Sequence, residues 1–110
     1  SGKKFNVIYA ENDDMAKGAV AALDKANISH GVGKDVVIMG FDCNKWALQE
    51  LKKKNWNYDG QCNPFQASYL DDIIKKLEAG ETITEKKIVL DEKGFDANEI
   101  TDADIEQYGI

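Results

Sequence analysis

Apolar residues along the chain fall into short continuous runs and helically spaced stripes. The run V-V-I-M at residues 36–39 is rich in β-branched side chains and lies between Gly33 and Gly40. It is too short for a buried helix and is typical of a strand buried on both faces, inside a parallel sheet. The pattern therefore predicts a central strand over residues 35–42, which ends at Asp42.

Further runs and stripes flank this strand on both sides. Strands are predicted over residues 4–11, 56–62 and 87–91, and helices over residues 15–27, 44–54, 64–79 and, as a short one, from residue 100. The third helix has the clearest start, because Asn63 is a good N-cap and Pro64 suits the first helical position. The alternating order predicts an α/β fold with a three-layer parallel sheet and right-handed crossovers.

Small polar side chains follow the first three predicted strands. Asn12 follows the first strand, Asp42 ends the second, and Gln61, Cys62 and Asn63 end the third. Parallel strands bring their carboxyl ends to one edge, where ligands of open α/β sheets bind. Asp and Asn together accept and donate hydrogen bonds, which matches the vicinal hydroxyls of a sugar. The alternative is that Asn12 and Asn63 only cap helices and Asp42 only ends a strand. We expect two aromatic rings beside this row, those of Trp46 and Phe65.

Composition and charge narrow the partners of the chain. Its 110 residues suffice for one modest domain, and 43% hydrophobic with 31% charged residues is typical of a globular protein. A net charge of -6 without a basic patch argues against nucleic acid. All 14 cations are Lys, so the guanidinium fork that clamps phosphates is missing and a tight phosphate-ester site is disfavoured.

Cysteine and histidine usage argues against metals and catalysis. Cys43 and Cys62 form no C-x-x-C pair and His30 is the only histidine, so we expect no metal and no cofactor. Two thiols that are not bonded to each other are favoured over a disulfide. The chain has no nucleophile elbow or phosphate loop, and the G-V-G at residues 31–33 precedes a strand instead of following one. We therefore expect a binding protein and not an enzyme.

Three motifs occur in a fixed order along the chain. They are N-D-D-M-A-K-G-A-V-A-A-L at residues 12–23, V-V-I-M-G-F-D at residues 36–42 and Q-C-N-P-F at residues 61–65. Together they resemble the type I periplasmic sugar-binding proteins, the solute receptors of ABC importers. That family shows N-D-x-M-A-x-G-A-x-x-A-L, V-x-V-V-G-F-D, and A-Q-N-P or, in a galactofuranose-binding branch, E-C-N-P. The resemblance covers nearly the whole chain, including an L-x-A-G-E turn at residues 77–81.

The resemblance assigns roles to the polar row. In the family the Asn of N-D and the Asp of G-F-D hydrogen-bond sugar hydroxyls, which implies these roles for Asn12 and Asp42. The next contact of the family is commonly a Gln two places before the Pro. Here Cys62 stands at that place and Gln61 one step earlier, so the third contact and the identity of the sugar stay open.

The resemblance also implies a domain organisation. Family members have two lobes and are much longer than this chain, which resembles only their C-terminal part. We therefore expect residues 1–110 to be a single α/β unit, a truncated lobe with the periplasmic-binding-protein-like I fold. The N-terminal lobe would be missing, and the crossing between lobes would fall near residues 62–64.

The function implied is carbohydrate uptake, as the sugar-binding component of an ABC transporter. The expected partners are a monosaccharide of galactofuranose, galactose or ribose type and the permease subunits, and the expected location is the periplasm or the cell surface as a lipid-anchored protein. The alternative is the effector-binding domain of a LacI-type regulator, which shares G-F-D but usually carries a second acid where Cys43 stands. A small flavodoxin-like enzyme or signalling domain is a third reading, for which the acids after Asn12 are a weak match.

The predicted helix over residues 64–79 carries a wide apolar stripe that needs a cover. Its residues are Phe65, Tyr69, Leu70, Ile73, Ile74 and Leu77. In the family this helix packs on the other lobe. The stripe can fold back on the sheet, or two chains can exchange it as a homodimer. The stiff link before Pro64 favours the homodimer.

Overall fold

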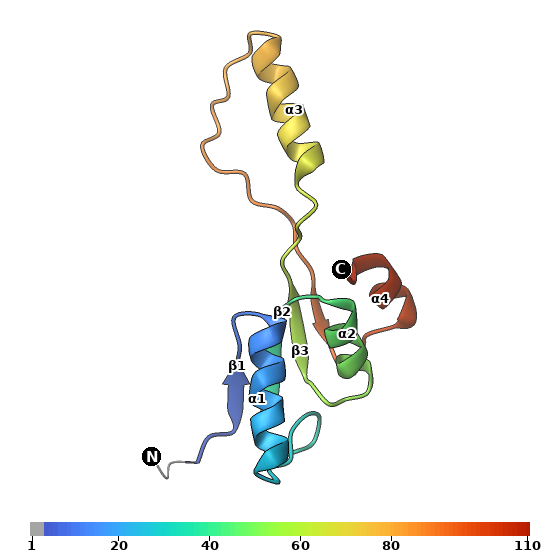
Figure 1. The fold of residues 1–110 in the computed structure, drawn as a ribbon. Coiled ribbons are helices and arrows are strands. Elements are labelled where there is room, and N and C mark those ends of the chain that lie inside the picture. Colours follow the sequence, from blue (N-terminus) through green and yellow to red (C-terminus); the bar gives the residue numbers. More distant parts are fainter. Residues whose placement is uncertain (1–3) are drawn as a thin grey trace. The chain divides into compact units, whose positions relative to one another are not determined.

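The computed structural model describes residues 4–110, which form two compact units (Figure 1). The first unit comprises residues up to 62 together with residues 93–110, and the second comprises residues 63–92. The first unit contains a sheet and three helices, and the second contains one helix followed by an extended segment. Within residues 4–110, no helix has the length and apolar character needed to cross a membrane.

The sheet of the first unit has four strands in the order β1-β2-β3-β4. β1 (Val7–Tyr9), β2 (Val37–Asp42) and β3 (Tyr58–Gln61) run parallel to one another. The helices between them make the βαβ crossovers that parallel neighbours require. The predicted α/β class and the parallel arrangement of these three strands are confirmed.

The fourth strand differs from the prediction in place and direction. β4 (Gly94–Asp96) pairs antiparallel with β3 and places Phe95 opposite Asp59, whereas residues 87–91 form no strand. The prediction of a strand over residues 87–91, and of a wholly parallel sheet, is therefore wrong. Residues 87–91 belong to the second unit, whose described residues offer no strand to pair with. Phe95 is only 3% exposed, and the burial of its ring fixes β4 in the sheet.

Three helices pack with this sheet, namely α1 (Asp13–Lys25), α2 (Lys45–Lys52) and α4 (Asp102–Tyr108). The predicted helix over residues 44–54 is confirmed as α2, and its inward positions Ala47, Leu48 and Leu51 are fully buried. The core joins these positions to the strands and to the C-terminal segment. Its buried residues are Ala10, Ala16, Leu23, Val36, Ile38, Cys43, Ala47, Leu48, Leu51, Trp56, Phe95, Ala97 and Ile105.

The two faces of the sheet differ in burial. Along β2, Ile38 and Gly40 are buried, whereas Met39 and Phe41 are half-buried. Tyr9 contacts the ring of Phe41, with centroids 5.3 Å apart, and remains 62% exposed. When strands follow one another in chain order, right-handed crossovers place the connecting helices on one face, which here is the face of Ile38. The expectation that the central strand is buried on both faces is therefore wrong for the described residues.

The second unit begins with a turn that replaces the predicted helix start. α3 (Ala67–Glu78) starts three residues later than predicted. The Phe65 N–H donates to Asn63 Oδ1 at 2.8 Å, and the Gln66 N–H donates to the Pro64 carbonyl oxygen at 2.9 Å. The predicted roles of Asn63 as N-cap and Pro64 as first helical residue are wrong, because the side chain of Asn63 closes a local turn before the helix begins.

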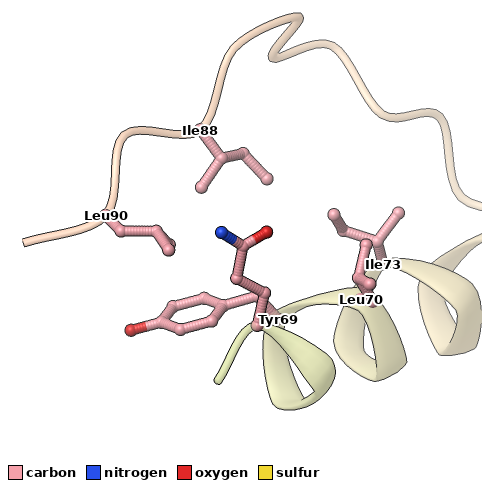
Figure 2. Close-up of a pocket in the computed structure, with 6 residues that line it drawn as sticks. Tyr69, Leu70, Ile73, Ile88 and Leu90 are labelled. Carbon is pink, nitrogen blue, oxygen red and sulfur yellow. The ribbon is translucent and has the colours of Figure 1, made fainter. Parts of the chain in front are cut away.

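An apolar hollow of ≈ 230 Å³ lies between α3 and the extended segment that follows it (Figure 2). Its lining residues are Gln66, Tyr69, Leu70, Ile73, Ile88 and Leu90. Other apolar side chains of the unit face solvent, among them Phe65 at 71% and Val89 at 75% exposure. No residue of α3 is buried. The segment therefore covers the predicted stripe only in part.

Candidate functional site

The carboxyl ends of β1, β2 and β3 meet at one edge of the sheet. Asp42 ends β2 directly opposite Gln61, the last residue of β3. The Ala10 N–H donates to the Met39 carbonyl oxygen at 3.0 Å, which extends the register of β1 along β2. Asn12 follows two residues later, and Figure 1 shows α1 and α2 starting from this edge. The structure thus brings together the three strand ends at which the sequence predicts a ligand site.

Asn12 is the N-cap of α1. Its backbone is extended, with φ -155° and ψ 170°, and its Oδ1 accepts a hydrogen bond from the Met15 N–H at 2.8 Å. This bond satisfies one of the N–H groups that a helix start leaves without a partner. The oxygen of this half-buried side chain therefore caps the helix. Capping engages the oxygen and not the amide nitrogen, which can still serve as a donor at the edge of the sheet.

The turn after Asp42 has an unusual backbone. Asp42 and Cys43 have positive φ values of 117° and 61°, a region that costs non-glycine residues about 1–3 kcal/mol. Two donors of Asn44 hold the far side of the turn, since its N–H and its Nδ2 reach Asp13 Oδ2 at 2.8 and 3.1 Å. The Ile110 N–H donates to the Cys43 carbonyl oxygen at 3.1 Å. These bonds stabilise the strained turn and fix the half-buried carboxyl of Asp42 at the strand end.

The third strand end carries Gln61 and Cys62, which differ in exposure. Gln61 is half-buried, and its Oε1 accepts a hydrogen bond from the Lys93 N–H at 3.2 Å. Cys62 is exposed, whereas Cys43 is buried, and the two are not joined by a disulfide. Gln61 can offer its amide nitrogen to a ligand, while its oxygen holds the start of β4.

The two aromatic residues expected beside the polar row have different surroundings. The ring of Trp46 packs edge-on against Trp56, with centroids 5.8 Å apart, and Lys17 Nζ lies 4.5 Å from the Trp46 centroid. Phe65 belongs to the second unit, where its side chain is largely exposed. The ring of Trp46 is therefore already engaged by the core and by a lysine.

Two buried acids lie beside this edge, and sequence reasoning missed both as site residues. Asp13 in α1 and Asp59 in β3 are each 0% exposed. Burial, followed by the charge of Asp13, raises the pKa of Asp59 to about 8, and burial also raises the pKa of Asp13. The signal that could have revealed them is the Y-D-G at residues 58–60, because an acid inside a core strand is rare unless it is paired.

The described residues offer hydrogen-bonding groups at this edge and no metal site. Across residues 4–110, no group of three or more His, Cys, Asp or Glu side chains is placed to hold a metal ion. The ring of His30 is engaged elsewhere, with Nδ1 at 2.9 Å from the Asn55 carbonyl oxygen and Nε2 at 3.1 Å from Asp24 Oδ1. The edge therefore combines a carboxylate with amide donors, a set suited to binding a polyhydroxylated ligand.

Comparison with known proteins finds relatives that are similar in sequence and in structure. The fructose import binding protein FruE of Bifidobacterium longum is 37% identical over 90 residues, which are 82% of this chain and 26% of FruE. A Mycobacterium smegmatis protein solved in complex with beta-D-fucofuranose is 33% identical, with a TM-score of 0.75 over 90% of this chain and 32% of that protein. The arabinose ABC transporter binding protein of Shewanella sp. ANA-3 has a TM-score of 0.82 over 97% of this chain and 34% of its own, at 23% identity, which shows likeness of fold alone. No protein-family model matches the chain.

The chain is thus a relative of the type I periplasmic sugar-binding proteins, and the resemblance found in its motifs is confirmed. It spans about a quarter of the length of the curated relative and about a third of the solved structures. By name, the matched proteins bind or import sugars and are not enzymes.

Proposed function

We propose that the chain is part of the sugar-binding component of an ABC importer, and that Asn12, Asp42 and Gln61 contact hydroxyl groups of a monosaccharide. The observation that carries the proposal is the half-buried carboxylate of Asp42, held in a strained turn opposite Gln61 at the edge where Asn12 also lies. A fixed acceptor beside amide donors suits vicinal hydroxyls. Cys62, exposed beside Gln61, is the neighbouring position that we assign to the rim of the same site.

The substitution Asp42→Ala tests this assignment. Removing a charged acceptor from buried hydroxyls lowers affinity about thirtyfold, which corresponds to about 2 kcal/mol. Calorimetry on the two-lobed receptor that contains this chain measures the change. Asp14→Ala removes an exposed acid from the first turn of α1 and serves as the matched control, with affinity unchanged. Equal affinity of Asp42→Ala and the wild type would refute the role of Asp42.

The chain by itself gives a second readout. We expect the chain alone to bind sugar weakly, because it offers only part of the contacts. Amide shifts of residues 12, 42 and 61 in an NMR titration with millimolar D-fructose, D-galactose, L-arabinose and D-ribose report contact directly. Shifts confined to these strand ends support the site. Shifts elsewhere, with none at the strand ends, would contradict it.

The proposal extends to domain organisation, location and the transport partner. The first unit forms a sheet-based lobe, and the chain leaves it after Cys62, where we place a crossing towards the rest of a longer receptor. The matched import binding protein supports a place outside the cytoplasm and ABC permease subunits as partners. Sugar uptake by cells that express receptor and permease measures this partnership. A receptor that binds sugar but supports no uptake with its permease would argue against it.

We also propose that the isolated chain forms a homodimer through α3. Leu70, Ile74 and Leu77 are more than half exposed, and each large side chain left in water forfeits about 1.5–3 kcal/mol of burial. Exchange of α3 between two chains covers this stripe. Light scattering at micromolar concentration is expected to give twice the monomer mass, and Leu70→Lys is expected to return the chain to a monomer. A monomeric wild type would refute the exchange.

A further inference from the structure

The carboxyl groups of Asp13 and Asp59 lie together in the core of the first unit. Both side chains are 0% exposed, Asp59 is paired with Gly40 in the sheet, and Asp13 Oδ1 lies over Gly40. Two donors of Asn44 satisfy Asp13 Oδ2. Among residues 4–110, Asp13 Oδ1 and both side-chain oxygens of Asp59 lack a partner with full hydrogen-bond geometry, although the Cys43 backbone N–H acts on Asp59. Two ionised carboxylates in this place would leave three buried oxygens without a full hydrogen bond.

The surrounding charges do not neutralise the pair. Asp42, at the end of β2, adds a negative charge to the field at both carboxyls. The Cys43 backbone N–H favours ionisation of Asp59, but by less than burial and Asp13 oppose it. Lysines on α2 and beside α4 are paired with other acids, in the pairs Lys45–Glu106, Lys52–Asp102 and Lys93–Asp104. Lys17 of α1 lies over the ring of Trp46. Because these lysines are engaged elsewhere, the negative charge of the Asp13–Asp59 pair is reduced by binding a proton.

We propose that Asp13 and Asp59 share one proton at neutral pH, so that Asp59 is a neutral carboxylic acid that donates to Asp13 Oδ1. One proton satisfies two of these three oxygens. The protonated oxygen of Asp59 becomes a hydrogen-bond donor, and Asp13 Oδ1 accepts that hydrogen bond. It also removes the repulsion between two buried like charges. The raised pKa values of both acids agree with this arrangement.

The shared proton makes Asp59 a positioning residue for the turn at the strand end. Asp13 Oδ2 holds both donors of Asn44, and Asn44 follows the strained pair Asp42–Cys43. When the proton is lost, the negative charges of Asp59, Asp13 and Asp42 repel one another. This repulsion destabilises the turn that Asn44 holds. Its bearing on sugar binding rests on the function proposed above, whereas the proton itself does not.

The sign of the pH dependence follows from the raised pKa values. Unfolded Asp59 titrates near 3.8, and in the folded chain its pKa is about 8. The folded state binds the extra proton between these values, so the contribution of the pair to stability falls as the pH rises from about 4 to about 8. Asp104 acts in the opposite direction, because its pKa is lowered to about 2 by Thr101 and Lys93 and its contribution is lost only in acid.

Carboxyl-carbon NMR of the ligand-free chain tests the proton directly. Asp59 is expected to remain protonated at pH 6 and to titrate near pH 8, and the amides of Cys43 and Asn44 are expected to shift with the same midpoint. Titration of both Asp13 and Asp59 below about pH 5, as ordinary carboxyls do, would overturn the shared proton. Amides of the turn that ignore the Asp59 midpoint would overturn its positioning role.

The variant Asp59→Asn provides the matched chemical test, since an amide donates to Asp13 without a titratable proton. Its urea midpoint is expected above that of the wild type at pH 9 and at or below it at pH 5. Asp14→Asn, at an exposed position of the same helix as Asp13, is the control for removal of one acidic group. A midpoint difference that is equal at both pH values would overturn the proposal. If Asp59→Asn does not fold, Asp13→Asn gives the same comparison. None of these readouts uses sugar, so failure of the proposed function leaves them intact.

Discussion

The two units carry amphipathic helices of the same kind and bury them to opposite extents. In the first unit, the inward face of α2, represented by Leu48 and Leu51, is 0% exposed. In the second unit, α3 has a wider stripe, yet Leu70 is 56% and Leu77 is 54% exposed. The difference lies in the partner, because α2 has a sheet to pack on and α3 has only an extended segment. A stripe specifies that a helix has a face to bury, and the rest of the chain decides whether it is buried.

The reactivity of the two cysteines is expected to show the largest difference between buried and exposed positions. Cys43 is 0% exposed and Cys62 is exposed. A thiol reagent reaches Cys43 only when the first unit opens, which can require the whole free energy of unfolding, about 5–15 kcal/mol. Cys62 reacts without opening. Absorbance with Ellman's reagent follows both phases, and Cys62→Ser identifies the fast one. A single fast phase for both thiols would contradict the packing of the first unit.

Matched truncations of the two helices come next in size. Leu48→Ala in α2 leaves a cavity in the core and is expected to lower the free energy of unfolding by about 2–5 kcal/mol. Leu70→Ala in α3 removes a half-exposed side chain, and the expected loss in the monomer is within about 0.5 kcal/mol. Urea unfolding at submicromolar concentration, where a dimer dissociates, compares the two variants. Equal losses would mean that α3 is buried as deeply as α2.

The smallest contrast is between Thr101, which caps a helix, and Asn63, which does not. Thr101 and Asp104 form a reciprocal capping box on α4, with the Asp104 N–H donating to Thr101 Oγ1 at 3.1 Å, so Thr101→Ala is expected to cost about 1 kcal/mol. Asn63 caps no helix, and Asn63→Ala is expected to stay within about 0.5 kcal/mol. Thermal unfolding followed by circular dichroism measures both. A larger loss for Asn63→Ala would place the start of α3 where the sequence predicts it.

Local signals in the sequence were sufficient where burial and pattern agree. The parallel strands β1 to β3, the stripe of α2 and the cap at Asn12 all follow from runs, spacing and N-cap chemistry. The meeting of Asn12, Asp42 and Gln61 at one edge then follows from topology, because parallel strands share the direction of their ends. These features depend on contacts that the pattern itself specifies.

The remaining features depend on tertiary contacts with distant residues, which a local sequence pattern does not specify. Residues 87–91 have strand-forming side chains but no neighbouring strand, whereas β4 is fixed by one buried ring, that of Phe95. Asp59 reads as a polar position of an alternating strand, and its burial depends on Asp13 from another element. At Asn63, a side-chain hydrogen bond competes with the hydrogen bonds of an earlier helix start. The spacing of apolar residues does not predict which of the two forms.

The hydrogen bonds between Gln61 and Lys93 have a consequence for chain connectivity. The Gln61 N–H donates to the Lys93 carbonyl oxygen at 2.8 Å, so the chain leaves the first unit and re-enters it at adjacent points. For the first unit, β3 and β4 are the arms of an antiparallel hairpin, and residues 63–92 are its oversized loop. Each doubling of loop length raises the free energy of loop closure by about 0.6 kcal/mol. A connection of this length therefore destabilises the hairpin by only about 2 kcal/mol compared with a tight turn. The connection between β3 and β4 can therefore be lengthened or shortened without any change in the strand order of the sheet.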